Sequence, residues 1–449
     1  MTATTISALA PELAAGRLRA ERLTEDALSA IASLQPSLNA FITVLSESAL
    51  ENARAADREI AGGRYRGPLH GVPISIKDLV DIAGVPTTAA SRLRAEHVAK
   101  RDAPVISHLK NAGAVLVGKT NLHEFAFGTT SEDSGWGPAR HPLDPTRSPG
   151  GSSGGSAAAV RAGMSVASVG TDTGGSVRIP AAACGIVGLK PAWGEISAHG
   201  VVPLSRQLDH VGPLTNSVDD AAVMYDVLRG LTPRGVQSSS GGVSTFTFAT
   251  LDGYFRERIA TEVETGIDTA YERLRQAGAR MSSRALPHAG DIAPIYLHLV
   301  LADAAAYHAT ALERRPHGYT ENVRLRLEMG RQVLAEDYVR ALHGRRVITR
   351  EVEHALAGVD ALLLPSLAVE APPIGANAVP VKGGSEPVRN IMLRCTQPFN
   401  LSGHPAITLP CGTTASGLPI GLQIVGHLGR TDDLLHIARA VERALSSRG

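Results

Sequence analysis

Apolar residues near the start of the chain recur at the spacing expected of helical faces. In residues 5–32 this spacing predicts two short helices joined near Gly16. The run VPISI at 72–76 has the alternation of a strand. A further helix follows with Asp102 as its N-cap, and then the short apolar strand AGAVLVG at 112–118. Helix, strand, helix and strand in this order favour a layered α/β fold.

The rest of the chain carries the same mixture of helical and extended patterns. They predict a helix running into a strand at 157–170, helices at 257–276, 296–356 and 431–447, strands at 245–251 and 357–366, and paired strands at 405–412 and 417–426. Residues 232–245, TPRGVQSSSGGVST, are the one linker-like stretch. We expect a surface loop there, between two halves of a single domain of residues 1–449.

Composition excludes several classes of function. With 43% hydrophobic and 19% charged residues, the chain has the material for a large core, which disordered proteins lack. The formal net charge of +1 provides no field that would attract nucleic acid or an anionic membrane. No apolar run is long enough to span a bilayer, and the N-terminus has no signal-peptide pattern. The prediction is a cytoplasmic protein without nucleic-acid or membrane partners.

The three cysteines, Cys184, Cys395 and Cys411, are far apart in the sequence. They form no CxxC pair, so neither a zinc site nor a disulfide framework is indicated. Free buried thiols in a reducing compartment are the simplest interpretation. We expect no metal and no cofactor.

Two glycine-rich runs carry serines that are suited to chemistry. They are GGSSGGS at 150–156, within the polar stretch 128–156, and TGGS at 173–176. Glycines let the backbone bend sharply, and successive free N–H groups in such a turn form a concavity for an anion. A phosphate site and an oxyanion hole share this physics. The phosphate hypothesis is weak, because neither GxxxxGK[ST] nor GxGxxG after a strand is present.

Two other interpretations of these runs stay open at this point. In the first, both runs are tight turns with no catalytic or ligand-binding role. Alternatively, GSSGG matches the nucleophile elbow GxSxG with Ser153 at its centre, which requires a histidine farther along the chain. Downstream histidines include His199, His210, His288 and His298, but none stands in an informative context.

Lys77 ends the apolar run VPISIK and shares a face with Ser75. A lysine at such a place is usually solvated. If it is buried, however, desolvation lowers its pKa, because burial disfavours the charged form. A neutral lysine can serve as the base for a serine nucleophile, and Ser–Lys arrangements are accepted variants of the catalytic triad.

These motifs together resemble the amidase signature family of serine hydrolases. The resemblance runs from about residue 65 to 225 with high specificity, and more loosely from about 360 to 447. It rests on the segments PISIKD, AGAVLVGKTNLHEFAFG, GGSSGGSAAAV, GTDTGGSVRIPAAACGIVGLKP, NLSGHPAITLPCG and GLPIGLQIVG. It implies an α/β fold with a large mixed β-sheet covered by helices on both faces.

The resemblance also implies a Ser–cis-Ser–Lys triad of Ser176, Ser152 and Lys77. Ser176 would attack the substrate carbonyl, Ser152 would accept its proton across a cis peptide, and neutral Lys77 would be the base. The oxyanion would sit on the backbone N–H groups of Thr173, Gly174, Gly175 and Ser176. Supporting positions around the nucleophile would be Ser153, Asp172 and Arg178.

The substrate follows less directly from the sequence. The glutamine-hydrolysing branch of the family binds the substrate amino group with an aspartate, where this chain has Leu393; Arg326 matches the carboxylate-binding arginine of that branch. We therefore expect a free-standing amidase for apolar or aryl amides, anilides or carbamates (urethanes), with side esterase activity. The tentative substrate-binding positions are Phe125, Phe127, Gly128, Thr129, Trp136 and Leu393.

Two alternatives remain for the function. One is the glutamine-hydrolysing subunit of a tRNA-dependent amidotransferase, and the other is a small primary-amide hydrolase that works with a partner protein. In the favoured hypothesis the partner is a small-molecule amide or carbamate, and the chain is a monomer or a homodimer.

Overall fold

The computed structural model describes residues 4–234 and 241–446, and one mixed sheet runs through them. In these residues the sheet has eleven strands, in the order β1 (Phe41–Val44), β3 (Val115–Thr120), β2 (Pro73–Lys77), β4 (Ala167–Asp172), β6 (His210–Thr215), β5 (Val187–Lys190), β12 (Ala406–Thr413), β13 (Pro419–Val425), β9 (Ala361–Pro365), β7 (Thr247–Leu251) and β8 (Arg280–Arg284). Strand β5 pairs antiparallel with β12, so both halves of the chain build one sheet. This continuity supports the predicted single domain.

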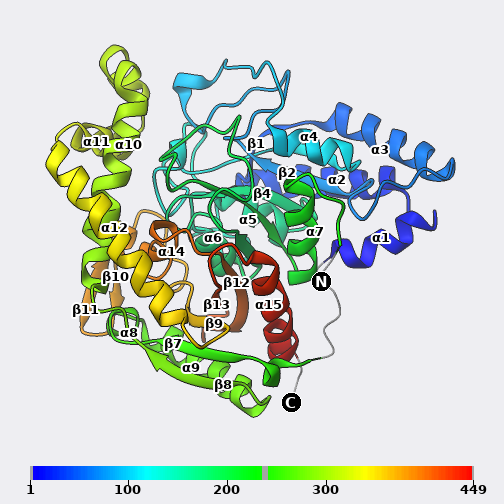
Figure 1. The fold of residues 1–449 in the computed structure, drawn as a ribbon. Helices are drawn as coiled ribbons and strands as arrows, with labels where there is room; N and C mark the ends of the chain where they lie inside the picture. Colours follow the sequence, from blue (N-terminus) through cyan, green and yellow to red (C-terminus); the bar gives the residue numbers. More distant parts are fainter. Residues whose placement is uncertain (1–3, 235–240, 447–449) are drawn as a thin grey trace.

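Helices cover the sheet on both faces (Figure 1). On one face, neighbouring helices pack against one another in the order α4 (Pro104–Asn111), α7 (Val218–Leu228), α15 (Thr431–Ser446) and α9 (Thr261–Gln276). On the other face α5 (Gly154–Arg161) contacts β2 and β4, and α6 (Arg178–Cys184) contacts β5, β12 and β13. Every residue of α6 and all but the last residue of α5 are buried, so neither helix presents a face to solvent. The predicted α/β class is confirmed.

The remaining elements extend this layered core at its two ends. They are α1 (Ile6–Ala14), α2 (Ala20–Leu38), α3 (Ser46–Ala61), α8 (Tyr254–Glu257), α10 (Ile292–Arg314), α11 (Glu321–Gly330), α12 (Ala335–Leu356), α13 (Val388–Leu393), α14 (Pro398–Leu401) and the hairpin of β10 (Ala378–Val381) with β11 (Gly384–Pro387). Figure 1 shows α1, α2 and α3 at one end of the molecule and α10, α11 and α12 at the other.

Two predicted helix starts are wrong for local reasons. Asp102 does not cap α4, because its carboxylate accepts hydrogen bonds from the Ala83 N–H and the Lys110 ammonium, and Ala103 is the N-cap residue instead. The long helix predicted from residue 257 begins at Thr261. The N–H of extended Ala260 bonds the Ala368 carbonyl, which separates α9 from the short α8. Of the predicted loop 232–245, residues 235–240 lie outside the described residues.

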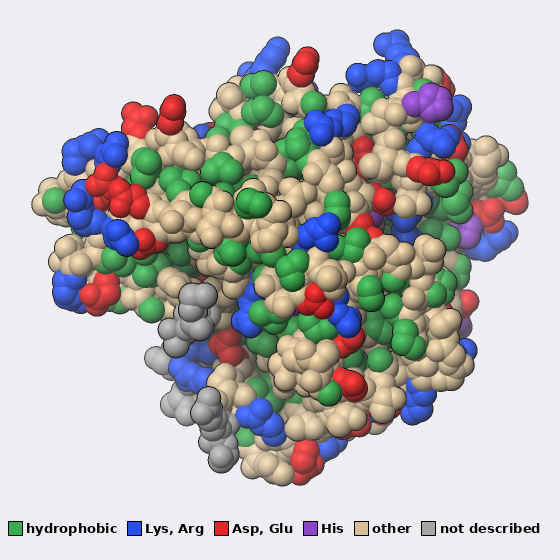
Figure 2. Space-filling model, turned by 180° about the vertical axis from the view of Figure 1, so that it is seen from behind, with side chains coloured by type: hydrophobic (Ala, Val, Ile, Leu, Met, Phe, Trp, Pro, Cys, Tyr) green, Lys and Arg blue, Asp and Glu red, His purple; other side chains and the backbone are tan. Residues whose placement is uncertain are grey.

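One described helix region, Ala289–Arg314, is long and apolar enough to cross a membrane by length and composition. Core helices of soluble proteins pass the same test, and α10 packs on α11 and α12. The face in Figure 2 shows acidic and basic side chains interspersed, without one dominant sign. This arrangement agrees with the near-zero net charge.

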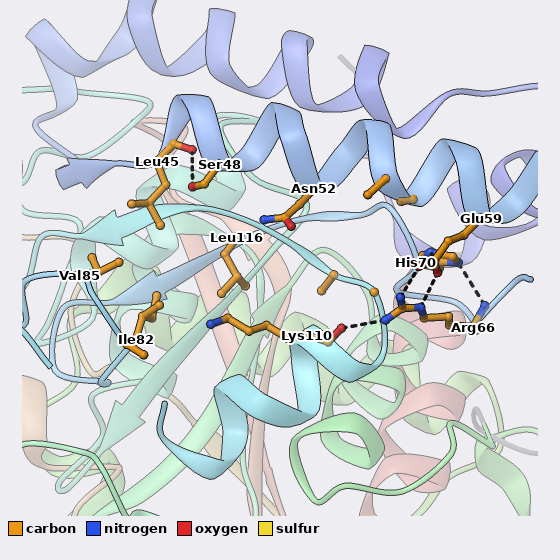
Figure 3. A pocket seen from close by; sticks show the side chains of 15 residues that line it. Leu45, Ser48, Asn52, Glu59, Arg66, His70, Ile82, Val85, Lys110 and Leu116 are labelled. Atoms are coloured by element: carbon orange, nitrogen blue, oxygen red, sulfur yellow. Dashed lines mark hydrogen bonds and ion pairs between the residues drawn. The ribbon is translucent and has the colours of Figure 1, made fainter. Parts of the chain in front are cut away.

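A groove between α3 and α4 is lined by Leu45, Ser48, Asn52, Ile82, Val85 and Leu116, with Glu59, Arg66 and His70 toward one end and the Lys110 side chain extending from α4 toward Ile82 (Figure 3). Its charged groups already have partners, since Arg66 pairs with Glu59 at 2.6 Å and Lys110 pairs with Asp102 at 2.7 Å. The groove shares no lining residue with the cavity that contains Ser176. It is therefore separate from the candidate chemistry.

Candidate active site

Parallel strands bring the candidate base to the middle of the sheet. Strand β2 pairs in parallel with β4, with Ile76 opposite Val169, so the carboxyl ends of both strands meet at one edge. Lys77 is the last residue of β2, and Asp172 is the last residue of β4. In open α/β sheets, ligands bind outside the carboxyl ends of strands. The sheet thus places both residues where a site is expected.

Lys77 is completely buried, contrary to the usual solvated lysine of a strand end. Its Nζ donates to Ser152 Oγ at 2.8 Å and to Thr171 Oγ1 at 2.8 Å, and both partners are hydroxyls. Burial lowers the pKa of Lys77 to about 7, although the carboxylates of Asp172 and Asp209 oppose the shift. A substantial fraction of Lys77 is therefore neutral at neutral pH.

Ser152 and Ser153 lie next to each other and do different things. The peptide between Gly151 and Ser152 is cis, as the resemblance implied. The Ser152 hydroxyl faces Lys77, whereas the Ser153 hydroxyl donates to the Thr171 carbonyl at 3.2 Å. The Ser153 N–H bonds the Ser176 carbonyl at 3.3 Å, which ties this turn to the second glycine-rich run. Ser153 is thus occupied with the backbone, which argues against the nucleophile elbow.

The second run, residues 173–176, forms a tight turn between β4 and α6. Its carbonyls are held in place: Thr396 Oγ1 donates to Gly174 O at 2.6 Å, and the Ile179 N–H donates to Gly175 O at 2.6 Å. Gly175 has a φ of 142°, and a Cβ there would lie 2.2 Å from Thr396 Oγ1, so the turn needs glycine.

The backbone N–H groups of Thr173, Gly174, Gly175 and Ser176 make no hydrogen bond within the described part of the chain. Nearly all buried backbone N–H groups in native proteins are paired, so four consecutive free donors are unusual. Such a set is suited to a negatively charged oxygen.

Behind this turn lies a buried ion pair. The Arg178 guanidinium donates two hydrogen bonds to the Asp172 carboxylate, from Nε at 3.0 Å and from the NH2 nitrogen at 2.9 Å. Both side chains are fully buried. Arg178 also bonds Asn400 Oδ1 and Gln423 Oε1, and so links the turn to α14 and β13. Burial alone would raise the pKa of Asp172, but the Arg178 charge outweighs it and holds the pKa well below its usual range.

A second carboxylate supports the turn from the other side. Asp209 accepts a hydrogen bond from Thr173 Oγ1 at 2.6 Å and further bonds from the backbone N–H groups of Leu204 and Ser205. Burial raises the pKa of Asp209 to about 6, while these hydrogen bonds and the Lys77 charge oppose the rise. No sequence signal pointed to Asp209, because it lies 36 residues from Thr173 and outside both glycine-rich runs.

A small cavity opens over Ser176, and the space free of atoms in it and in the solvent at its mouth is ≈ 250 Å³. It is lined by Ala126, Phe127, Gly128, Thr129, Thr173, Ser176, Leu204, Tyr296, Arg389 and Leu393. Four of the six tentative substrate positions are therefore brought together there. The other two lie elsewhere: Phe125 packs edge-on against His308, and Trp136 lies under the Arg92 guanidinium.

Tyr296 and Arg389 line the cavity but were not singled out in the sequence. They come from α10 and α13, where no glycine-rich or catalytic motif marked them. Arg389 and Leu393 are four residues apart on one helix and therefore share a face. This helical spacing, which places an arginine one turn before the predicted substrate position Leu393, is the one sequence pattern that pointed toward Arg389.

Other catalytic arrangements lack the residues they need. No histidine lines the cavity within the described ranges 4–234 and 241–446, so a Ser–His–Asp triad has no base there. In the same residues no group of three His, Cys, Asp or Glu side chains is placed to hold a metal ion. The three cysteines are buried and free, and burial raises the pKa of the Cys395 and Cys411 thiols to about 12.

Comparison with known proteins agrees with this geometry. A family model described as Amidase matches residues 22–435. A glutamyl-tRNA(Gln) amidotransferase subunit from Chloroflexus aurantiacus is 39% identical over 475 residues, which cover 98% of this chain and 96% of that protein. An amidase from Pseudomonas putida is 39% identical over 431 residues, covering 93% and 91%. A crystal structure of an amidase matches with a TM-score of 0.92 and 37% identity, covering 98% of this chain and 99% of that one. The chain therefore belongs to the amidase family and is a hydrolase of amide C–N bonds.

Proposed function

We propose that this protein hydrolyses amides through an acyl-enzyme on Ser176, with Lys77 as the base and Ser152 as the proton carrier. The observation that carries the proposal is the fully buried Lys77, whose Nζ lies 2.8 Å from Ser152 Oγ and whose pKa is lowered to about 7. A buried lysine that contacts only hydroxyls through its Nζ has little structural purpose as an ion. As a neutral amine it can accept a proton.

The proposed reaction begins with proton transfer. Ser176 Oγ passes its proton to Ser152 Oγ as Ser152 passes its own to neutral Lys77. Ser176 Oγ then forms a bond to the carbonyl carbon, and the carbonyl oxygen becomes an oxyanion. The relay returns the proton to the leaving nitrogen, the C–N bond breaks, and an ester on Ser176 remains. Water, activated by the same relay, hydrolyses this ester.

The free N–H groups of residues 173–176 support oxyanion stabilisation in this scheme. In a well-studied serine protease, one such donor lowers the activation barrier by about 3–4 kcal/mol. Asp172 and Arg178 anchor the end of β4 to the start of α6, and Asp209 holds the Thr173 side chain. We assign these residues to positioning the turn, since none of them lines the cavity.

The cavity bears on the substrate range. Its apolar members Phe127, Leu204 and Leu393 support the predicted acceptance of apolar acyl groups. Aryl amides, anilides, carbamates and esters remain part of the proposed range, and the leaving group decides which of them fit.

The test compares the wild type with Ser176→Ala on an anilide, followed by arylamine release, and on a panel of primary amides, followed by ammonia release. The proposal requires that the wild type hydrolyses at least one of these classes and that Ser176→Ala hydrolyses none. Continued turnover by Ser176→Ala would refute it. Release of arylamine specifically would establish a roomy leaving-group side.

A second candidate is the glutamine-hydrolysing subunit of a tRNA-dependent amidotransferase, working with partner proteins. It is favoured by the 39% identity to a relative of that name from Chloroflexus aurantiacus. The site argues against it, because Leu393 lines the cavity where that branch has its aspartate, and Arg326 is engaged with the Phe127 carbonyl at 2.6 Å. Glutamine as the preferred substrate in the ammonia panel would favour this candidate.

A further inference from the structure

A further groove lies between the C-terminal end of α10 and the short 3₁₀ helix Arg92–Arg94. Its lining residues are Leu93, Arg94, Phe125, Tyr307, His308, Thr310, Ala311, Arg314, Arg315 and Tyr319. It shares no lining residue with the Ser176 cavity. The two are neighbours, however, because Phe125 lines the groove whereas Ala126 and Phe127 line the cavity. The volume of the groove, ≈ 320 Å³, falls at the lower end of the range of small-molecule pockets, about 300–1,000 Å³, so it can hold a small ligand.

Three arginines give this groove a positive charge. They are Arg94, Arg314 and Arg315, and no Asp or Glu is among the lining residues. None of the three forms an ion pair within the part of the chain that the structure describes. The Nε of Arg94 donates to the Thr87 carbonyl at 3.2 Å, which leaves its two terminal nitrogens without a partner in the same residues. The groove therefore holds guanidinium donors that no protein carboxylate engages.

The dipole of α10 accounts for only part of this arrangement. Arg314 is the last residue of α10 and Arg315 is its C-cap, and cations at a helix C-terminus interact favourably with the helix dipole. Arg94 belongs to a different segment, so the dipole does not explain why it lines the same groove. A third like charge adds repulsion, which water weakens but does not remove. An anion with more than one negative charge would relieve that repulsion.

Aromatic rings make up much of the remaining lining. The rings of Phe125, Tyr307 and Tyr319 surround that of His308, with centroids 4.3, 4.9 and 5.5 Å from it. Burial, and then the Arg94 charge, lower the pKa of His308 to about 4, so this ring is neutral at neutral pH and the positive charge comes from the arginines. Tyr307 is 44% exposed, so part of its ring is accessible to a ligand in the groove.

We propose that this groove binds a small phosphate monoester that carries a planar ring, such as a nucleoside monophosphate. The arginines bind the phosphate, because a guanidinium donates paired N–H groups to phosphate oxygens and a monoester carries about −1.5 to −2 charges at neutral pH. Tyr307 packs against the planar ring, since every nucleobase has a face that stacks on an aromatic side chain. A ligand with a single carboxylate would leave most of the arginine charge uncompensated. The site is independent of the proposed function, because Lys77, Ser152 and Ser176 do not line it.

The test is isothermal titration calorimetry at low ionic strength, with AMP as the probe. Inorganic phosphate and ribose phosphate carry the anion without the planar ring, and adenosine carries the ring without the anion. The proteins are the wild type, Arg94→Gln, Arg315→Gln, Tyr307→Ala and Ser176→Ala. Arg340→Gln is the matched control, since the Arg340 side chain is 75% exposed and pairs with Asp337.

We expect AMP to bind the wild type roughly 10-fold more tightly than phosphate or ribose phosphate, as the stacking of one base predicts. Adenosine should bind more weakly than AMP by at least the same factor. Arg94→Gln and Arg315→Gln should each weaken AMP binding roughly 10-fold, because each removes a charge-assisted hydrogen bond. Tyr307→Ala should bind AMP no better than ribose phosphate. Arg340→Gln and Ser176→Ala should bind AMP as the wild type does.

A wild type that does not bind AMP, or that binds adenosine as tightly, would overturn this inference, and neither comparison needs a variant to fold. An AMP affinity that both arginine variants leave unchanged would also overturn it. Loss of AMP binding in Ser176→Ala would place the ligand in the catalytic cavity instead. A single-stranded RNA that binds more tightly than AMP would show that the groove belongs to a longer nucleic-acid surface, contrary to the proposal. Amide hydrolysis by Ser176→Ala would refute only the proposed function.

Discussion

Lys77 makes the pH dependence of the reaction calculable. A lysine with an ordinary pKa of about 10.4 has roughly one molecule in 2,500 in the neutral form at pH 7. With its pKa lowered by burial to about 7, half of Lys77 is neutral at that pH. Burial therefore raises the concentration of the active base about a thousandfold. Because the neutral form is the active one, the rate must rise with pH and then level off.

The assay is kcat/KM for an uncharged amide from about pH 5 to about pH 10, so that the substrate itself does not titrate. We expect a tenfold rise per pH unit below about 7 and a plateau above it. Below pH 6 the fall in rate should become shallower, because Asp209, with a pKa of about 6, then gains a proton and no longer raises the pKa of Lys77. Lys77→Arg should be inactive throughout, since arginine does not deprotonate.

The Asp209→Asn variant tests the direction in which the Asp209 charge shifts the pKa of Lys77. The Asp209 carboxylate stabilises protonated Lys77 and so raises the pKa of Lys77. Its removal must lower that pKa and move the rising limb of the profile to lower pH. A flat profile, or a shift of Asp209→Asn toward higher pH, would each show that neutral Lys77 is not the base. A midpoint near 10 would show that burial does not lower the pKa of Lys77.

Three further outcomes follow from the same geometry. Ser153→Ala should keep most of the wild-type activity, because its hydroxyl bonds only backbone groups of Thr171; loss of all activity with folding intact would contradict this. Gly175→Ala should fold but lose most of kcat, since its Cβ would lie 2.2 Å from Thr396 Oγ1 and would displace the turn; an unchanged kcat would show that the turn is not used. Arg178→Gln should lower the free energy of unfolding by about 3–5 kcal/mol, as removal of one partner from a buried ion pair does, and urea unfolding measures this; a change below about 1 kcal/mol would mean that the Arg178 ion pair contributes little.

Local sequence determined the parts of the site that were predictable. The alternation in VPISIK and the glycines of the two serine-bearing runs constrain their own backbone, so the strand and the turns could be predicted locally. The choice of Ser152 over Ser153, and of Lys77 as the base, came from the resemblance to the amidase signature family. The predicted pairing of β12 with β13 is confirmed for the same reason, because alternating apolar runs joined by a short turn form a hairpin locally.

The walls of the cavity depend on packing between distant segments, and there sequence reasoning failed. Phe125 looked equivalent to Phe127, yet a backbone kink with φ of 50° at Phe125 accompanies packing of its ring against His308 rather than in the cavity. Arg389 and Tyr296 come from helices without motifs, and only the folded chain brings them into the cavity with Ser176. The predicted apolar substrate range rested on Leu393 and the apolar residues just before it, and it did not take account of the charged Arg389 one helical turn away.

The most direct test of the central claim is to trap the acyl-enzyme. The wild type is quenched with acid during turnover of an ester whose acyl group the enzyme accepts, and peptide mass mapping then locates the added acyl mass. We predict that the mass appears on Ser176 of the wild type and on no residue of Ser176→Ala. Acylation of Ser153 or of any other residue, with turnover retained by Ser176→Ala, would contradict the account.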